Sequence, residues 1–240
     1  MTVDGWTQAV RQQLRLGRLL PLGGPSDGAW ITEGAAEAVL RQGVRDLRGV
    51  RLGPLRIASA DPEGAYEAAV PPPPSALPPG PLRVTADFTA TAQSEPLPTV
   101  ASHLRAALAT SAERLGLAVT EIDLRVTALL DELPEPEPVH PPEPPEAGPD
   151  TSPEESRAVT AALAVPGVTR LTGTLGGLGR AIHFEDRADA PAALPRRHAR
   201  VEIAVQADHR AVEVARAVRT AVSESLPDHP TVAVLVTTVG

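Results

Sequence analysis

The sequence predicts an α+β protein built from two tandem modules, each a small sheet of three to four strands with helices packed on one face. Two stretches, "ERLGLAVTEIDLRVTALLD" and "PDHPTVAVLVTTVG", each run from a helix-like segment through a short break into an apolar strand. An acidic, proline-rich segment, residues 133–155, separates them. One helix-and-strand unit therefore occurs twice, and proline, which neither continues a helix nor donates to a sheet, marks the boundary.

The length and composition fit two domains and limit the ligands that they bind. With 240 residues, of which 42% are hydrophobic, the chain can bury two cores of about 100 residues each. Aromatic residues make up only 2%, so a stacking platform for bases is not expected. The net charge of −8 repels phosphate backbones, and no nucleic acid is expected as a partner.

Residues 1–24 predict an N-terminal amphipathic helix. On a helix from about Trp6 to Leu20, apolar residues lie beside a group of arginines, and together they form the candidate interaction site: Trp6, Val10, Arg11, Leu14, Arg15 and Arg18. Such a helix can lie on an anionic membrane or in the groove of a protein partner, and it can equally pack on the first module. Its charges exclude a secretory signal, and no stretch of the chain reaches the roughly 20 apolar residues of a membrane span.

Residues 25–132 predict the first module, with the element order β-α-β-β-α-β. A short strand in "DGAWIT" precedes a helix with Thr32 as its N-cap, and the chain turns at Gly49 into a second strand. The proline-rich residues 69–82 are predicted to form an inserted loop. The strand in "LRVTADFTATA" alternates apolar and polar residues, and a helix then ends at Gly116 before the closing strand "VTEIDLRV".

Residues 156–240 predict a divergent second module that lacks an obvious first strand. "SRAVTAALAVPGVTRL" is a helix broken at a Pro-Gly-Val turn, and "ARVEIAVQAD" alternates as a half-buried strand does. The last helix and the strand "TVAVLVTTV" repeat the spacing of their counterparts in the first module. The linker between the modules, residues 133–155, is predicted to be extended, solvated and semi-rigid, and to set the reach between them.

The order of these segments resembles the alkaline shock protein family of bacterial envelope stress proteins. Members typically open with a Gly-x-Ile-x-Ile strand and a helix that ends in a Gly-Val turn, and they close on Gly-Leu-x-Val-x-x-Val-x-Val. The resemblance covers residues 27–131 well and 156–239 only loosely. The corresponding positions here are Gly28, Ile31, Gly49, Val50, Val84, Gly116, Leu117, Val119, Ile122 and Leu124.

The resemblance implies a non-enzymatic scaffold at the cytoplasmic side of the cell envelope. It implies self-association and a protein partner anchored in the membrane, so peripheral membrane contact belongs to the same expectation. The acidic proline-rich linker, the second divergent copy and the long loop at residues 69–82 depart from the family pattern. The bias toward Ala, Arg, Gly, Pro and Val is typical of GC-rich, actinobacterial genomes.

The segment "GTLGGLGRA" offers the main alternative function. The Walker loop needs Gly-Lys-Ser/Thr, whereas Gly179 is followed here by Arg180, and the segment precedes a strand, not the helix of a Rossmann fingerprint. The spacing of Gly173, Gly176 and Gly179 also resembles the GXXG loop of KH domains, which joins two helices. A KH-like nucleic-acid-binding or small-ligand-binding module that uses Gly173–Gly179 therefore remains the alternative to the scaffold.

No catalytic, metal-binding or cofactor-binding set of residues emerges from the sequence. The chain has no cysteine, which excludes thiolate nucleophiles and thiolate metal sites. None of its six histidines is spaced as H-x-x-x-H or H-E-x-x-H. We therefore expect no enzyme activity, no catalytic residue, no metal and no cofactor.

Overall fold

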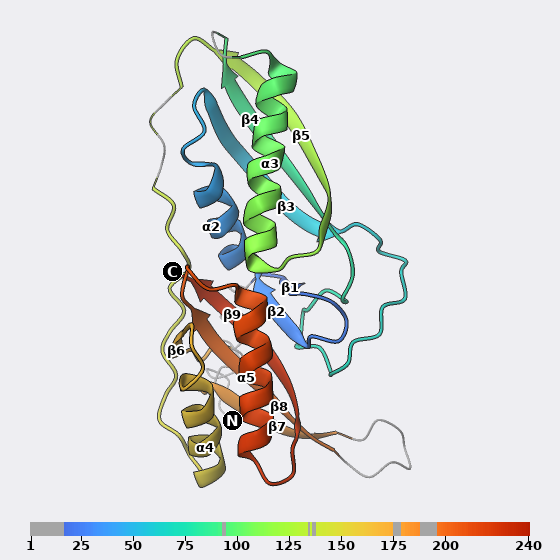
Figure 1. Ribbon diagram of the computed structural model, residues 1–240, viewed down its shortest axis with the longest axis vertical. Helices are drawn as coiled ribbons and strands as arrows, with labels where there is room; N and C mark the ends of the chain where they lie inside the picture. Colours follow the sequence, from blue (N-terminus) through green and yellow to red (C-terminus); the bar gives the residue numbers. More distant parts are fainter. Residues whose placement is uncertain (1–16, 93–94, 134, 136–137, 175–178, 188–195) are drawn as a thin grey trace, which may run out of the picture.

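Two sheets of unequal size, each with a pair of helices on one face, make up the protein (Figure 1). The computed structural model describes residues 17–92, 95–133, 135, 138–174, 179–187 and 196–240. The α+β prediction is confirmed. The described elements, in chain order, are β1 (Leu19–Pro21), β2 (Ala29–Thr32), α2 (Glu33–Val44), β3 (Val50–Ser59), β4 (Leu82–Thr91), α3 (Leu97–Leu115), β5 (Val119–Leu130), α4 (Pro153–Leu163), β6 (Val168–Leu171), β7 (Ile182–Arg187), β8 (Arg196–Val205), α5 (Ala211–Ser225) and β9 (Thr231–Val239).

The small sheet has the order β3-β4-β5, with β3 antiparallel and β5 parallel to β4. Strand β4 alternates between buried and more exposed residues, because one of its faces packs on helices and the other faces solvent. Helix α3 crosses from β4 to β5 and buries one stripe of residues on the sheet: Val100, Leu104, Leu108, Ala112 and Leu115. Helix α2 packs beside α3.

The large sheet has the order β1-β2-β9-β8-β6, and β7 also pairs with β8. Strands β6 and β7 run antiparallel along the same edge of β8, one after the other, and the glycine-rich segment interrupts them. Helix α5 connects the parallel strands β8 and β9, and α4 packs beside it. Strand β9 is buried on both faces, which explains its nearly continuous run of valines.

The connections β4-α3-β5 and β8-α5-β9 have the same element order, and their strand pairs correspond at the ends of the closing strands. Each closing strand has one irregularity near its end, after the pair Phe88 with Val126 and after the pair Ile203 with Val236. A threonine occupies the irregular position in both strands. Thr127 donates its hydroxyl to the Phe88 carbonyl at 3.2 Å, and Thr237 donates to the Ile203 carbonyl at 3.1 Å. This match supports the interpretation that one unit is present twice, although the two sheets differ in size.

The placement of β2 differs from the prediction for residues 25–132. This strand precedes α2, which packs over the small sheet, yet β2 itself pairs in parallel with β9 of the large sheet. Ala29, Trp30 and Ile31 lie opposite Val234, Leu235 and Val236. The large sheet therefore has six strands instead of three to four, because the N-terminal half of the chain supplies the first strand that its C-terminal half lacks.

The segment predicted as a solvated linker contacts the body of the protein at several points. Arg51 donates to the Glu135 carbonyl at 2.8 Å, and Arg170 donates to the Pro144 carbonyl at 2.9 Å. Glu146 forms an isolated bridge with Thr172. Because extended chain offers its carbonyls freely, arginines on both halves bind it, so in its described part it lies along the protein instead of spanning open solvent.

Asp27 joins the turn between β1 and β2 to helix α5. Its carboxylate accepts hydrogen bonds from Arg216 Nε at 2.7 Å, from Arg216 Nη2 at 2.9 Å and from the Gly24 amide at 2.7 Å. The hydrogen bond from Arg216 holds the pKa of Asp27 below its ordinary value. The N-terminal hairpin is thus attached by charge to the C-terminal half.

We expect Asp27→Asn to destabilise the protein at neutral pH by about 1–3 kcal/mol, because the guanidinium of Arg216 and the amide of Gly24 lose a charged acceptor. The pKa of Asp27 is lower in the folded protein than in the unfolded one. The stabilisation by the Asp27 carboxylate is therefore fully present above the unfolded pKa of about 3.9, and it is lost as the pH falls through the folded-state pKa. Urea unfolding at several pH values measures it. Asp46→Asn, at an exposed position, is the control, and equal losses in both variants at neutral pH would contradict the assignment.

Candidate protein-association edge

The outer edge of β5 is open. Among the described residues, no strand pairs with it, and β5 forms the boundary of the small sheet in Figure 1. Arg105 of α3 donates Nε to the Ile122 carbonyl at 3.3 Å, so a side chain, and not a neighbouring strand, binds that group. An open strand edge offers amides and carbonyls to another chain.

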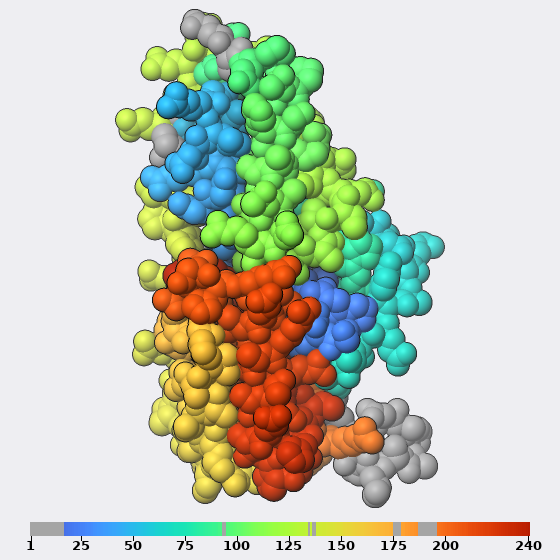
Figure 2. All heavy atoms as spheres, in the orientation of Figure 1, coloured from blue at the N-terminus to red at the C-terminus, as the bar shows by residue number. Residues whose placement is uncertain are grey.

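Apolar side chains along this edge are only partly covered. Ile122, Leu124 and Val126 lie opposite Val84, Ala86 and Phe88 and so face the helical side. Their partners on β4 are buried, whereas Val126 is 41% exposed and Leu129, further along, is 53% exposed. In the space-filling view, β5 reaches the surface beside α3 (Figure 2). The apolar face of the small sheet therefore ends in an incompletely covered stripe.

The corresponding edge of the large sheet shows what such a strand looks like when it is covered. Val236 of β9 corresponds to Val126 and has no exposed surface. The difference comes from β2: the Val234 amide donates to the Gly28 carbonyl at 3.0 Å, and Thr32 Oγ1 donates to the Thr237 carbonyl at 3.1 Å. One of two matching strand edges is filled within the chain, and the other is not.

The proline-rich segment explains why β5 has no such partner. Helix α2 begins after its N-cap Thr32, and the three residues before that cap belong to β2. Helix α4 begins after its N-cap Ser152, and the matching residues are Pro149–Thr151. Proline has no amide to donate, and the Thr151 amide already donates to Glu155 Oε2 at 2.8 Å. This segment cannot serve as a second β2.

The solvent face of β5 carries alternating charges that pair with β4. Arg83 contacts Glu121 and lies 3.7 Å from Asp123, and Arg125 binds Asp87 with distances of 2.8 and 2.7 Å. The hydrogen bond from Arg125 lowers the pKa of Asp87. The side chain of Arg125 is 74% exposed, so its charge is accessible to a second strand beside β5.

The candidate interaction residues of the N-terminal segment divide between described and undescribed parts of the chain. Five of them lie outside the described residues: Trp6, Val10, Arg11, Leu14 and Arg15. Arg18 is described, and it binds Glu33 at 2.7 Å and the Ile57 carbonyl at 2.9 Å. The predicted helix does not extend to Leu20, because Leu19–Pro21 form strand β1, with a left-handed Gly17 just before it. Arg18 is therefore a structural residue in this conformation.

The glycine-rich segment joins two strands on one edge of β8. Gly173 and Gly179 are described, whereas Gly176 lies outside the described residues. The Gly179 carbonyl accepts a hydrogen bond from the Gly148 amide, and the Gly173 amide donates to the Pro145 carbonyl at 3.2 Å. The KH loop joins two helices, so this placement, between β6 and β7, does not match that of a KH loop.

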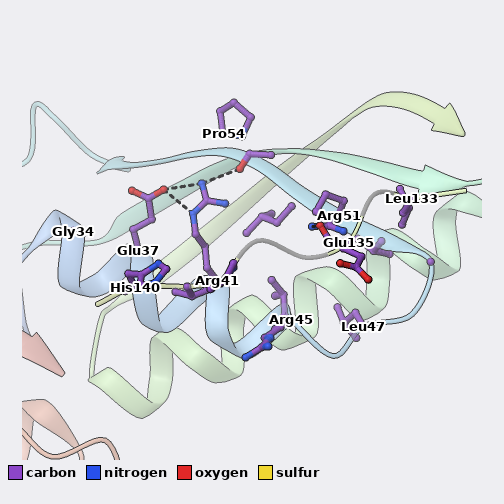
Figure 3. Close-up of a pocket in the computed structure, with 18 of the residues that line it drawn as sticks. Gly34, Glu37, Arg41, Arg45, Leu47, Arg51, Pro54, Leu133, Glu135 and His140 are labelled. Carbon is purple, nitrogen blue, oxygen red and sulfur yellow. Dashed lines mark hydrogen bonds and ion pairs between the residues drawn. The ribbon is translucent and has the colours of Figure 1, made fainter. Parts of the chain in front are cut away.

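A hollow of about 1050 Å³ lies between α2, β3 and the proline-rich segment (Figure 3). Two of its three lining arginines, Arg41 and Arg51, bind groups within the chain, whereas Arg45 is exposed. Arg41 binds Glu37 at 2.7 Å and the Gly53 carbonyl at 3.0 Å, and Arg51 binds the Glu135 carbonyl. Arg41 and Arg51 hold the walls of the hollow together, and one exposed arginine beside them does not form a prepared anion site.

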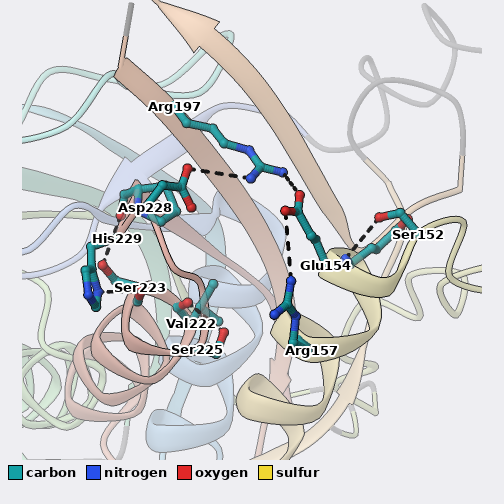
Figure 4. A network of polar contacts seen from close by, with 11 residues as sticks. Ser152, Glu154, Arg157, Arg197, Val222, Ser223, Ser225, Asp228 and His229 are labelled. Carbon is teal, nitrogen blue, oxygen red and sulfur yellow. Dashed lines mark hydrogen bonds and ion pairs between the residues drawn. The ribbon is translucent and has the colours of Figure 1, made fainter.

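A charged network at the other end of the protein joins α4, β8 and the turn after α5 (Figure 4). Arg197 binds Glu154 at 2.5 Å, lies 3.5 Å from Asp228 and stacks over the Phe184 ring at 4.1 Å. The hydrogen bond to Glu154 raises the pKa of Arg197. Because it has two acidic partners and an aromatic one, Arg197 fixes α4 to the sheet.

Glu202 and His183 form a buried polar pair on the large sheet. Glu202 has no exposed surface, and it accepts hydrogen bonds from the amide of Thr174, at 2.7 Å, and from the hydroxyl of the same residue. His183 Nε2 lies 4.0 Å from Glu202 Oε1, and burial, with Arg200 nearby, lowers the pKa of His183. A substrate cannot reach the fully buried carboxylate of Glu202. Its hydrogen bonds from Thr174 instead anchor the start of the glycine-rich segment.

The described residues contain no cluster of histidine and acidic groups with metal-binding geometry and no helix able to cross a membrane. Comparison with known protein families, with curated proteins and with solved structures finds no match to this chain. The edge of β5 combines an open strand, among the described residues, with exposed apolar side chains.

Proposed function

We propose that this protein is a non-enzymatic scaffold or adaptor that acts by associating with other protein chains through the open edge of β5. The observation that carries the proposal is the contrast between Val126 and its counterpart Val236, of which only the second is covered by a strand. Strand addition at an edge gives affinity through backbone hydrogen bonds and specificity through alternate side chains.

The resemblance to the alkaline shock protein family supplies the cellular part of the proposal. On that basis the protein works at the cytoplasmic face of the cell envelope, self-associates and binds a membrane-associated protein partner. The structure offers an additional reason to favour a protein ligand: two of the three arginines around the hollow in Figure 3, Arg41 and Arg51, bind groups within the chain.

Photo-crosslinking in the native cell tests this proposal. A photoreactive residue in place of Val126 should form crosslinks to protein, and the same residue in place of Leu163 should not. Leu163 is the matched control because it is 47% exposed on α4, away from the β5 edge. A membrane-anchored partner would bring the crosslinked product into the membrane fraction. Equal or absent crosslinking at both positions would contradict the assignment of the edge.

A further inference from the structure

We propose that the open edge of β5 pairs with the β5 edge of a second copy of this chain, antiparallel and centred on Leu124. This inference rests on the proposed function and names its partner. Two copies related by a twofold axis would join their small sheets into one six-stranded sheet, β3-β4-β5-β5-β4-β3. Such an interface is isologous, so the same patch must be complementary to itself.

The apolar residues of β5 meet this requirement. When Leu124 lies opposite Leu124 of the second copy, Ile122 lies opposite Val126 and Val119 lies opposite Leu129. Val119, Ile122, Leu124, Val126 and Leu129 lie opposite Leu82, Val84, Ala86, Phe88 and Ala90, which are all buried toward the helices. Each partly exposed apolar residue would therefore face another across the new pair, on the helical side of the joined sheet.

The charges on the other face select the same register. In it, Asp123 lies opposite Arg125 of the second copy, twice by symmetry. A shift that centres the pair on Asp123 opposes two aspartates and places apolar Val126 opposite Thr120, which outweighs its pairing of Glu121 with Arg125. A shift centred on Arg125 opposes two arginines. A shift by a single residue would place charged residues opposite apolar ones. The register centred on Leu124 is the one that satisfies both faces.

Charge reversal with mixing tests the pairing. In Asp123→Arg alone, Arg faces Arg, and in Arg125→Asp alone, Asp faces Asp, so we expect each homodimer to weaken at least tenfold. A mixture of the two variants restores both opposite-charge pairs and should dimerise like the unaltered chain. Analytical ultracentrifugation measures all three, and circular dichroism checks folding, since exposed ion pairs contribute little to stability. Failure of the mixture to associate would overturn the register.

Disulfide trapping provides a second test, which does not depend on charge. The chain has no cysteine of its own, so Leu124→Cys introduces a single thiol. Directly opposite residues in an antiparallel pair have Cα atoms about 4.5–5.5 Å apart, which a disulfide can bridge. Val126→Cys is the matched control, because the two thiols would lie about 14 Å apart along the strands. Equal crosslinking of both variants, or none with Leu124→Cys, would contradict the proposal.

The outcomes separate this inference from the proposed function. If the unaltered chain is monomeric and the photoreactive residue at position 126 captures a different protein, the proposed pairing with a second copy is wrong and the scaffold function stands. If position 126 captures no protein, both fail. If it captures another copy of the same chain and the charge-reversed mixture dimerises, both are supported.

Discussion

We expect Trp30→Ala to lower the free energy of unfolding by about 3–5 kcal/mol, the range seen when a buried aromatic side chain is removed. Trp30 is 1% exposed and packs in a small cluster on the face of the large sheet opposite the helices, with Leu19, Val70, Ala233 and Leu235. Its indole Nε1 donates to the Leu77 carbonyl at 3.3 Å. One side chain therefore holds β1, β2, β9 and the loop after β3.

Thermal and urea unfolding measure the effect of Trp30→Ala. A loss of this size corresponds to a melting temperature lower by roughly 6–20 °C for a chain of this length. Trp30→Phe is the matched control: it keeps most of the apolar volume and loses the N–H bond, so we expect a loss of about 1 kcal/mol. If the alanine variant were no less stable than the phenylalanine variant, β2 would not be packed against β9 in solution.

Local patterns in the sequence predict most of the individual elements. Alternation in "LRVTADFTATA" predicts β4, and the apolar stripe beginning at Val100 predicts α3. Thr32 as an N-cap is confirmed by its hydrogen bond from the Ala35 amide, and Gly116 as a C-cap by its left-handed backbone. These features depend on residues that are near neighbours along the chain, so a single sequence contains the information.

The pairing of β2 with β9 could not be predicted in the same way. The four residues of β2 and the strand β9 are about two hundred residues apart, and nothing in "AWIT" distinguishes an edge of one sheet from an edge of the other. One signal was present: β9 has an unbroken apolar run, which is typical of a strand covered on both faces and on both sides. Strand β5, with its interspersed charges, lacks that run.

The candidate site was predicted only in general terms. The family resemblance implies self-association, but the sequence does not show which strand edges are open and which are already occupied. That distinction requires the register, which equates Val126 with Val236, and the exposed fractions of the two side chains. The N-terminal residues that the sequence favoured as an interaction site lie largely outside the described part of the chain, and Arg18 serves the fold.

Gly116→Ala is expected to destabilise the protein by about 2–5 kcal/mol. Gly116 has a φ of 92°, where a Cβ costs about 1–2 kcal/mol. That Cβ would also lie 2.3 Å from Val212 Cγ1 on α5, and overpacking a core adds about 1–3 kcal/mol. The Gly116 carbonyl accepts from the Gly23 amide at 2.9 Å, so the end of α3, the β1–β2 turn and α5 meet at this residue.

Two comparisons separate the sources of this loss. Gly179→Ala is the control for the backbone, because Gly179 has a φ of 66° and no atom within 4 Å of an added Cβ. We expect it to cost only about 1–2 kcal/mol. An added Cβ at Gly116 lies 2.3 Å from Val212 Cγ1 and 2.5 Å from Val212 Cβ, so Val212→Gly removes both contacts. In the double variant with Val212→Gly the steric part should disappear, and the double variant should lose less stability than the sum of the two single losses. Urea unfolding of the four variants measures this coupling. If the losses of unfolding free energy in the two single variants added strictly, α5 would not contact the end of α3. The contact would then not contribute to holding the two halves of the chain together.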